Sequence, residues 1–210
     1  MGFDLIGIVG PIACGKGVIV DYLKQKHGYI SFSLSSILHD ELKKQGITVF
    51  TRTTLQDRGD ELRKKEGEGV LAKRAIEQLK AQSSKLKAEK IIIEGIRNQG
   101  EVAYLRTIPG FYLIAVDAKR EIRYQRVLSR GKPWDPKDWK TFLQVDGRDR
   151  GDTETSNGQQ VRKCMELADI RIENNGNMSE LMNSLKKALL SRHPLHTRRQ
   201  YTLFFDYFQF

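Results

Sequence analysis

The sequence has 210 residues, of which 39% are hydrophobic and 30% are charged, and its formal net charge is +10. This length suits one domain with an appendage, and the apolar content is sufficient for a buried core. We do not expect a membrane-spanning protein, because no apolar run approaches the roughly 18 residues that a spanning helix needs.

The excess of positive charge favours polyanionic ligands, from nucleotides to nucleic acids, without choosing between them. The two cysteines, Cys14 and Cys164, form no C-x-x-C pair, so the sequence indicates neither a zinc site nor a disulfide framework. The N-terminus carries no secretory leader pattern. We therefore expect a cytoplasmic protein without a membrane partner.

A phosphate-binding loop is the first feature along the chain. It has the spacing G-x-x-x-x-G-K and lies between an apolar strand expected at 3–9 and a helix expected at 17–27. Its glycines let backbone N–H groups turn inward, the helix adds its positive dipole end, and the lysine reaches the outer phosphates of a nucleotide. The predicted nucleotide-binding residues are Gly10, Pro11, Ile12, Ala13, Cys14, Gly15, Lys16, Gly17 and Val18, and Lys16 is also a catalytic candidate.

The loop departs from the usual pattern directly after the lysine, where a residue with a hydroxyl group, Ser or Thr, is normally found. That hydroxyl holds Mg²⁺ in many such loops, but neither Gly17 nor Val18 carries one. The pattern thus predicts binding of nucleotide phosphates more directly than metal-assisted transfer.

Strand and helix patterns alternate through the rest of the chain, which is typical of an α/β domain with a parallel sheet. Strands are expected at 29–33, 90–94, 111–116 and 169–173, and helices at 35–44, 53–65, 70–88, 100–108, 119–129, 157–168 and 178–191. Segment 131–155 is rich in Gly, Pro and charge and predicts a mobile lid or insertion. The expected fold is a three-layer P-loop NTPase fold with about five parallel strands and helices on both faces.

The predicted domain spans 1–191 and is followed by a basic and aromatic tail at 192–210. Six aromatic residues occupy the last ten positions. Such a tail is expected to pack on the domain, to form an oligomer contact, or to lead into a fused or partner domain.

The turn Glu94-Gly95-Ile96-Arg97 follows the short apolar strand at 90–94. Carboxyl ends of parallel strands meet at one edge of a sheet, so this turn is expected beside the phosphate loop. Glu94 is then placed to hold Mg²⁺ through water, and Arg97 to bind a phosphate.

The Gly-Lys-Gly loop, the Glu94–Arg97 turn and the segment Asp-Ile-Arg-Ile-Glu-Asn-Asn-Gly at 169–176 resemble the nucleoside monophosphate kinase group, which includes adenylate kinases and dephospho-CoA kinases. The resemblance covers roughly 3–190. It is strongest to an archaeal kinase-like family and to kinase-like domains fused to deoxycytidylate deaminases. Glu94 departs from the group, which usually has Asp there.

The resemblance implies ATP and Mg²⁺ as cofactors and assigns roles to individual residues. Lys16 would contact the β- and γ-phosphates, while Arg97 and Arg63 would hold the phosphate of the acceptor. Arg126 would cover the adenine, and Asn175 and Gly176 would border it. Arg130 would reach the phosphates as a catalytic residue. The arginines expected to close over the transferring group are Arg148, Arg150 or Arg162.

Three functions remain open at this point. The first is an ATP-dependent kinase that acts on a nucleoside monophosphate or a similar phosphate-bearing acceptor such as dephospho-CoA. The second is a catalytically weak nucleotide-sensing domain that regulates a partner or a fused deaminase; the chain itself lacks the P-C-x-x-C motif of a zinc deaminase. The third, nucleic-acid binding, is disfavoured because the aromatic residues are not interleaved with the basic ones.

Overall fold

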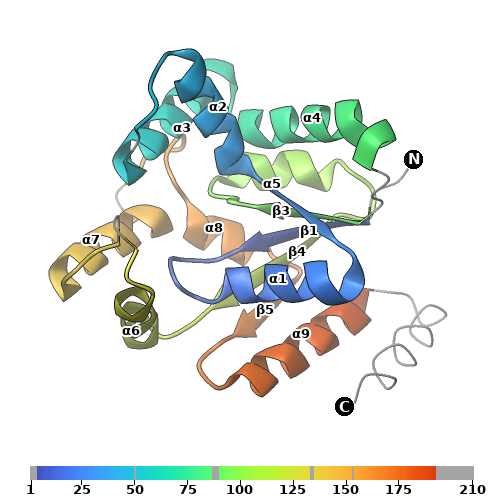
Figure 1. Cartoon of the computed structure of the whole chain (residues 1–210), viewed down its shortest axis with the longest axis vertical. Helices are drawn as coiled ribbons and strands as arrows, with labels where there is room; N and C mark the ends of the chain where they lie inside the picture. The colour runs from blue at the N-terminus through green and yellow to red at the C-terminus, as the bar shows by residue number, and fades with distance from the viewer. Residues whose placement is uncertain (1–3, 50, 87–89, 133–134, 153, 193–210) are drawn as a thin grey trace.

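The computed structural model describes residues 4–49, 51–86, 90–132, 135–152 and 154–192. The sheet has five parallel strands in the order β2-β3-β1-β4-β5 (Figure 1). The strands are β1 (Asp4–Val9), β2 (Ile30–Ser33), β3 (Lys90–Glu94), β4 (Tyr112–Asp117) and β5 (Ile170–Glu173). The predicted fold class is confirmed.

Helices follow the strands in alternation, as the sequence pattern predicts. They are α1 (Lys16–His27), α2 (Leu34–Lys44), α3 (Arg52–Glu66), α4 (Val70–Leu86), α5 (Gln99–Arg106), α6 (Arg120–Arg130), α7 (Trp139–Arg150), α8 (Val161–Glu166) and α9 (Met178–Arg192). The tail at 193–210 and the expected end of the fourth helix at 87–88 lie outside the described residues.

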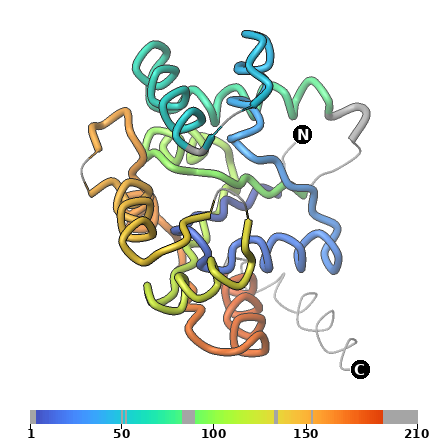
Figure 2. The backbone as a smooth tube through the Cα atoms, turned by 60° about the vertical axis from the view of Figure 1, so that its left-hand side comes forward, coloured from blue at the N-terminus to red at the C-terminus, as the bar shows by residue number. Residues whose placement is uncertain are grey.

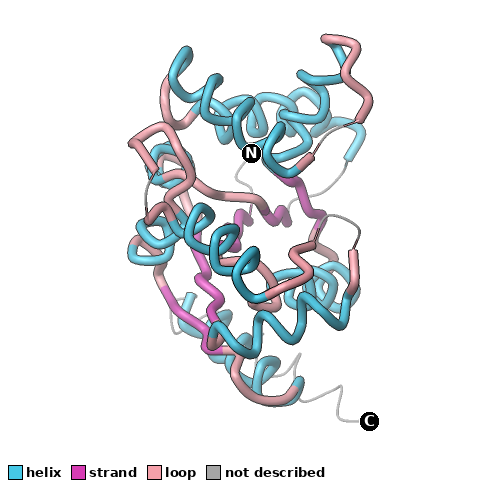
Figure 3. The backbone as a smooth tube through the Cα atoms, turned by 90° about the vertical axis from the view of Figure 1, so that its left-hand side faces the viewer, coloured by secondary structure: helices cyan, strands magenta, loops and turns pink. Residues whose placement is uncertain are grey.

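Alternating side chains of the strands feed two separate cores. Leu5 and Val9 of β1 face one side of the sheet, where α2, α4, α5 and α8 pack. Ile6 and Ile8 face the other side, where α1 and α9 pack. Because successive side chains of a strand point to opposite faces, nearly continuous apolar strands such as Ile91-Ile92-Ile93 supply both cores. The strands accordingly lie between layers of helices (Figure 3).

Most of the observed element boundaries lie within two residues of the expected ones. The helix expected at 35–44 begins at Leu34, with Ser33 at the N-cap position. The Ser33 side chain makes no capping hydrogen bond. Its hydroxyl group is hydrogen-bonded to the hydroxyl group of Ser35, at 2.9 Å. The helix expected at 157–168 is shorter and covers only Val161–Glu166.

The segment expected as a lid or insertion, 131–155, contains a regular helix that the sequence analysis did not predict. Asp138 caps α7 by accepting a hydrogen bond from the Thr141 N–H at 2.8 Å. The buried positions of α7 are Phe142, Asp146 and Asp149. They are spaced four and three residues apart and therefore share one helix face, but two of them are acidic. Figure 2 shows α7 between α3 and α6.

None of the described helices is both long enough and apolar enough to cross a membrane.

Candidate functional site

The phosphate loop lies between β1 and α1, at the carboxyl edge of the sheet (Figure 1). Two of its glycines are required by space. A Cβ atom at Gly10 would collide with the Val116 carbonyl oxygen, and one at Gly15 would collide with the Asn174 side chain. Gly15 also has a φ of +107°, and Ala13 one of +56°. Left-handed residues at such positions are typical of an anion-binding nest, in which successive backbone N–H groups can point inward.

Lys16 folds back over the loop that precedes it. Its Nζ atom donates hydrogen bonds to the carbonyl oxygens of Gly10 at 2.6 Å and Pro11 at 2.8 Å. Among the described residues no carboxylate forms an ion pair with this ammonium group. Neutral partners leave the charge of Lys16 uncompensated at the mouth of the loop, and this charge favours an anionic ligand.

A second wall of the loop comes from the end of β5 and from α6. The Asn174 amide donates to the Cys14 carbonyl oxygen at 2.9 Å, and the Arg126 Nη2 atom donates to the Asn174 carbonyl oxygen at 2.9 Å. The Nη1 atom of Arg126 is buried without a partner. A half-buried arginine with a buried, unused donor atom beside the loop fits a bound nucleotide, which would supply the missing acceptor.

Asn174, which contacts the loop directly, was not among the predicted residues. The neighbouring Asn175 is exposed, and its side chain accepts a hydrogen bond from the Lys119 N–H at 2.7 Å. Gly176 is exposed as well. The Asn-Asn-Gly segment was therefore the correct part of the sequence, but the prediction selected the wrong asparagine. Only the alternation of side chains along β5 distinguishes Asn174, which contacts the loop, from Asn175.

Glu94 ends β3, which pairs directly with β1. The pairing of Gly7 with Ile93 places the Glu94 end of β3 at the same sheet edge as the phosphate loop. Glu94 is half-buried, and its carboxylate makes no hydrogen bond or ion pair within the described part of the chain. A free carboxylate at this edge fits water-mediated binding of Mg²⁺, whereas neither Gly17 nor Val18 offers a hydroxyl.

Arg97 lies three residues after Glu94. Its side chain is held by a residue of α7 and by a residue of the loop before α8. Its Nη1 atom donates to the Asp149 Oδ1 atom at 2.8 Å and to the Gln159 Oε1 atom at 3.2 Å. The Arg97 side chain is 33% exposed, whereas Asp149 is 1% exposed. Arg97 is therefore accessible to a ligand, but its charge is already balanced by a buried carboxylate.

Arg63 of α3 is more deeply engaged. Its Nε and Nη2 atoms donate to the Glu101 Oε1 atom at 3.1 Å and 2.9 Å, and its Nη1 atom donates to Asp60 at 3.1 Å. Arg63 is 3% exposed and Glu101 is fully buried. The other carboxylate oxygen of Glu101 accepts from the Arg97 N–H at 2.7 Å. This ion pair fixes the Arg97 turn onto α3.

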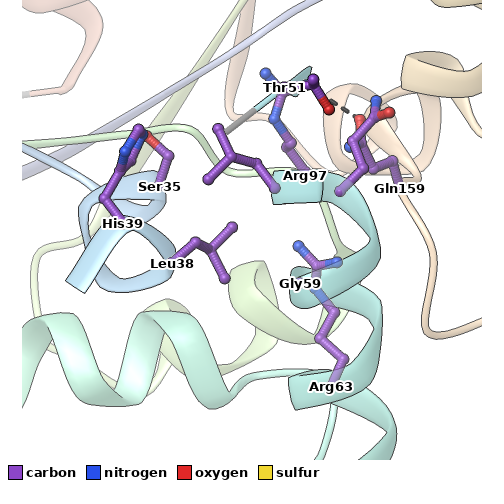
Figure 4. Close-up of a pocket in the computed structure, with 10 residues that line it drawn as sticks. Ser35, Leu38, His39, Thr51, Gly59, Arg63, Arg97 and Gln159 are labelled. Carbon is purple, nitrogen blue, oxygen red and sulfur yellow. Dashed lines mark hydrogen bonds between the residues drawn. The ribbon is translucent and has the colours of Figure 1, made fainter. Parts of the chain in front are cut away.

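The two arginines predicted to hold an acceptor phosphate line one pocket of about 370 Å³. Figure 4 shows Ser35, Leu38 and His39 of α2 on one side, and Arg63, Arg97 and Gln159 on the other. The remaining lining residues come from α3 and from the position before it: Thr51, Leu55, Gln56 and Gly59. Apart from Arg63 and Arg97, none of these lining residues was among the site residues predicted from the sequence.

The other predicted arginines are bound to carboxylates. Arg130 forms two hydrogen bonds with buried Asp135, at 2.6 Å and 2.7 Å. Arg148 contacts Asp57 at 2.9 Å, Arg150 contacts Asp117 at 3.2 Å, and Arg162 contacts Asp152 at 2.6 Å. In this arrangement each of these cations already has an anionic partner.

Asp60 lies between Arg63 and Arg148, at the contact of α3 with α7. Burial raises the pKa of its carboxyl group to about 6, although the two arginines oppose this shift. The acidic neighbours Glu154 and Asp57 raise the pKa further. The charge that Asp60 carries at this contact therefore changes around pH 6.

A buried ion pair attaches α7 to the phosphate loop. Arg123 of α6, which is fully buried, binds both carboxylate oxygens of Asp146 on α7 and also donates to the Ile12 carbonyl oxygen at 3.3 Å. Ile12 packs with Phe142 and Val127 in a small apolar cluster. The predicted lid segment is therefore packed directly on the loop, through Arg123 and Asp146, which sequence reasoning missed.

The parallel sheet, the glycine-bounded loop and the adjoining pocket define a P-loop kinase-like domain. A family model described as an AAA domain matches residues 6–150. The chain belongs to the UPF0200 protein family: it is 31% identical over 183 residues to a UPF0200 protein of Methanococcus maripaludis, covering 87% of this chain and 93% of that protein. A UPF0200 protein of Methanothermobacter thermautotrophicus is 30% identical over 155 residues, covering 72% of this chain and 74% of that protein.

Solved structures share the fold. TT1252 from Thermus thermophilus superposes with a TM-score of 0.58 at 21% identity, covering 92% of this chain and all of that one. Shikimate kinase from Acinetobacter baumannii, solved in complex with shikimate, superposes with a TM-score of 0.54 at 17% identity, covering 90% of this chain and 94% of that one.

Proposed function

We propose that this protein is an ATP-dependent phosphotransferase that moves the γ-phosphate to a nucleoside monophosphate or a similar phosphate-bearing acceptor, such as dephospho-CoA. The observation that carries the proposal is the position of two sites at one sheet edge. The phosphate loop holds the uncompensated charge of Lys16, and the neighbouring pocket contains Arg97. Phosphoryl transfer requires positioning and charge stabilisation more than covalent catalysis, and these two sites can provide both.

The roles of the loop residues follow from their present contacts. Bound ATP and Mg²⁺ would supply the phosphoryl group and part of the charge neutralisation. The loop N–H groups would hold the phosphates, and Lys16 would exchange its carbonyl partners for phosphate oxygens. Arg126 and Asn174 would flank the nucleotide, and Glu94 would hold the metal through water.

The acceptor side requires an exchange of ion-pair partners. An acceptor phosphate would replace Asp149 on Arg97, while Arg63 would mainly hold the turn in place through Glu101. Arg130, Arg148, Arg150 and Arg162 could reach the transferring group only after leaving their carboxylate partners. Closure of the α7 segment would exclude water from the reaction.

The test is ADP formation with ATP, Mg²⁺ and a panel of acceptors that includes the nucleoside monophosphates and dephospho-CoA. We expect turnover that depends on one acceptor class and is lost in Lys16→Ala and in Arg97→Met. The matched control is Lys73→Ala, which removes an exposed lysine of α4. Absence of ADP above background with every acceptor would refute phosphotransfer.

A second candidate function is nucleotide sensing without efficient turnover, in which the domain regulates a deaminase-type or other partner. It is favoured by the missing hydroxyl at Gly17 and Val18 and by the carboxylate that occupies Arg97. The tail at 192–210 is then proposed as an oligomer contact or the link to the partner. Tight ATP binding by calorimetry, together with no ADP formation, would favour this function over the first.

A further inference from the structure

Most polar side chains of the acceptor pocket already have partners. Arg63 and Arg97 are bound to carboxylates, and Gln159 accepts a hydrogen bond from Arg97. Thr51 caps α3 by accepting from the Thr54 N–H at 3.1 Å, and Ser35 shares a hydrogen bond with Ser33. His39 also has an interaction. These groups can contact a ligand only by sharing or exchanging a partner.

Gln56 is different. Its side chain lines the pocket and is 8% exposed, yet it makes no hydrogen bond within the described part of the chain. The amide atoms are not sealed from solvent, so both the donor and the acceptor of this group are available to a ligand in the pocket. Such a group on a pocket wall indicates a ligand that offers an acceptor and a donor side by side.

The neighbours of Gln56 narrow the chemistry of that ligand. Leu38 and Leu55 present apolar surface to the same pocket, with Leu38 on α2 and Leu55 next to Gln56 on α3. A flat, mostly apolar ring packs well against such side chains, while its edge carries the polar groups. The hydrogen-bonding edge of a nucleobase has this character, and glutamine amides pair with base edges through two hydrogen bonds.

We propose that Gln56 is the specificity-determining residue of the acceptor pocket and reads the base edge of a nucleotide acceptor, whose phosphate lies toward Arg97. This inference rests on the proposed function, since it takes the pocket to be the acceptor site. It goes further by assigning base recognition to one side chain and by requiring that the acceptor contain a base.

The experiment measures binding of AMP, CMP, GMP, UMP and ribose 5-phosphate by calorimetry, with and without ATP, for wild type and three variants. In Gln56→Ala the base-reading amide is lost, and in Gln56→Glu it becomes a carboxylate that only accepts hydrogen bonds. Gln82→Glu makes the same chemical change at an exposed position of α4 that does not line the pocket. Thermal melting confirms that each variant folds.

We expect wild type to prefer one base by about 10-fold or more, and Gln56→Ala to reduce that preference to within about 2-fold. Gln56→Glu should shift the ranking toward GMP, because guanine alone offers two adjacent donors, its ring N–H and its amino group, to a carboxylate. ATP affinity in the absence of acceptor should not change, and Gln82→Glu should behave as wild type.

Two results would overturn the assignment: a base ranking that persists in Gln56→Ala, or monophosphates that bind no more tightly than ribose 5-phosphate. The outcome is separable from that of the proposed function. Base-dependent binding abolished by Gln56→Ala without ADP formation supports the role of Gln56 and refutes phosphotransfer. Equal ADP formation with ribose 5-phosphate and with monophosphates supports phosphotransfer and refutes base reading.

Discussion

The phosphate loop and the acceptor pocket lie at the same sheet edge, but they hold their cations in opposite ways. In the loop, Lys16 is bound by the neutral carbonyl groups of Gly10 and Pro11, which lie within six residues of it. In the pocket, Arg97 and Arg63 are bound by carboxylates 52 and 38 residues away in the chain. Only the loop therefore presents an uncompensated positive charge.

The difference separates two kinds of binding site. An anion gains the full attraction of Lys16 by displacing only carbonyl groups, so the loop is ready to bind. An acceptor phosphate must compete with Asp149 for Arg97, and Asp149 belongs to α7. Occupation of the pocket is thereby coupled to the position of α7, which also packs on the loop through Phe142 and Ile12.

The largest effect is expected on the loop side. Lys16→Ala removes the charge but leaves no buried carboxylate unpaired, so the protein should remain folded with a Tm near that of wild type. ATP affinity or turnover should fall by about 1000-fold, as for the loss of a principal phosphate contact. Calorimetry and ADP formation measure the two quantities. An equally large loss of Tm would instead make Lys16 a structural residue.

On the pocket side, substitution of the two arginines should have different effects on stability and on turnover. Arg63→Met leaves Glu101 buried and without its cation, and we expect the free energy of unfolding to fall by about 3–5 kcal/mol. Arg97→Met removes the cation beside buried Asp149, but Asp149 keeps a further interaction and Arg97 is itself 33% exposed. We therefore expect a smaller cost of about 1–2 kcal/mol, while acceptor-dependent turnover falls by about 100-fold.

Urea unfolding and acceptor titrations distinguish the two arginines. Similar losses of stability in both variants would contradict the conclusion that Arg63 is mainly structural and that Arg97 is available to a ligand. A selective loss of acceptor binding in Arg63→Met, with stability unchanged, would restore the role that the sequence resemblance implied for it.

A third test adds what the loop lacks. Val18 is 37% exposed on the first turn of α1, so Val18→Thr places a hydroxyl there without disturbing the core. Magnesium-dependent turnover should rise by about 10-fold if the hydroxyl is limiting, in line with one added metal contact. Val18→Ala is the control for loss of the methyl groups. No gain in Val18→Thr would show that the metal is held adequately by other groups.

The contrast between the two regions also explains what could be predicted from the sequence. The loop is contiguous, so its strand, glycines and lysine were all recognisable, and apolar runs located the five strands. Helix α7 was missed because its buried face combines Phe142 with Asp146 and Asp149, which conceals the apolar periodicity of a helix. The arginines that pair with these two aspartates, Arg123 and Arg97, come from distant segments, and only the fold brings each pair together.

The same reasoning applies to the pocket residues. Arg63 and Arg97 were located because they follow recognisable patterns, but the neutralisation of Arg63 by Glu101 depends on the packing of α3 against α5. Gln56 looks like any polar residue on a charged helix, and its place on the pocket wall, with no side-chain partner among the described residues, is visible only in the folded protein.

The smallest expected effect is a pH dependence confined to the pocket side. The pKa of Asp60 is raised in the folded protein to about 6, above its usual value of about 4 in an unfolded chain. Folding therefore favours the protonated carboxyl group, and its stabilising contribution is complete below pH 4 and is lost as the pH rises through 6. Asp60→Asn fixes the neutral form and removes this dependence.

Between pH 5 and pH 7 the Tm of wild type should fall relative to that of Asp60→Asn. The change should correspond to about 1 kcal/mol, since Asp60 is partly exposed and screened, or about 2–4 °C for a chain of this size. Thermal melts of both proteins at the two pH values provide the measurement, and Asp152→Asn is the control on an exposed aspartate just after α7. An unchanged difference in Tm would mean that Asp60 remains ionised between its two arginines, and that the contact of α3 with α7 is held by charge alone.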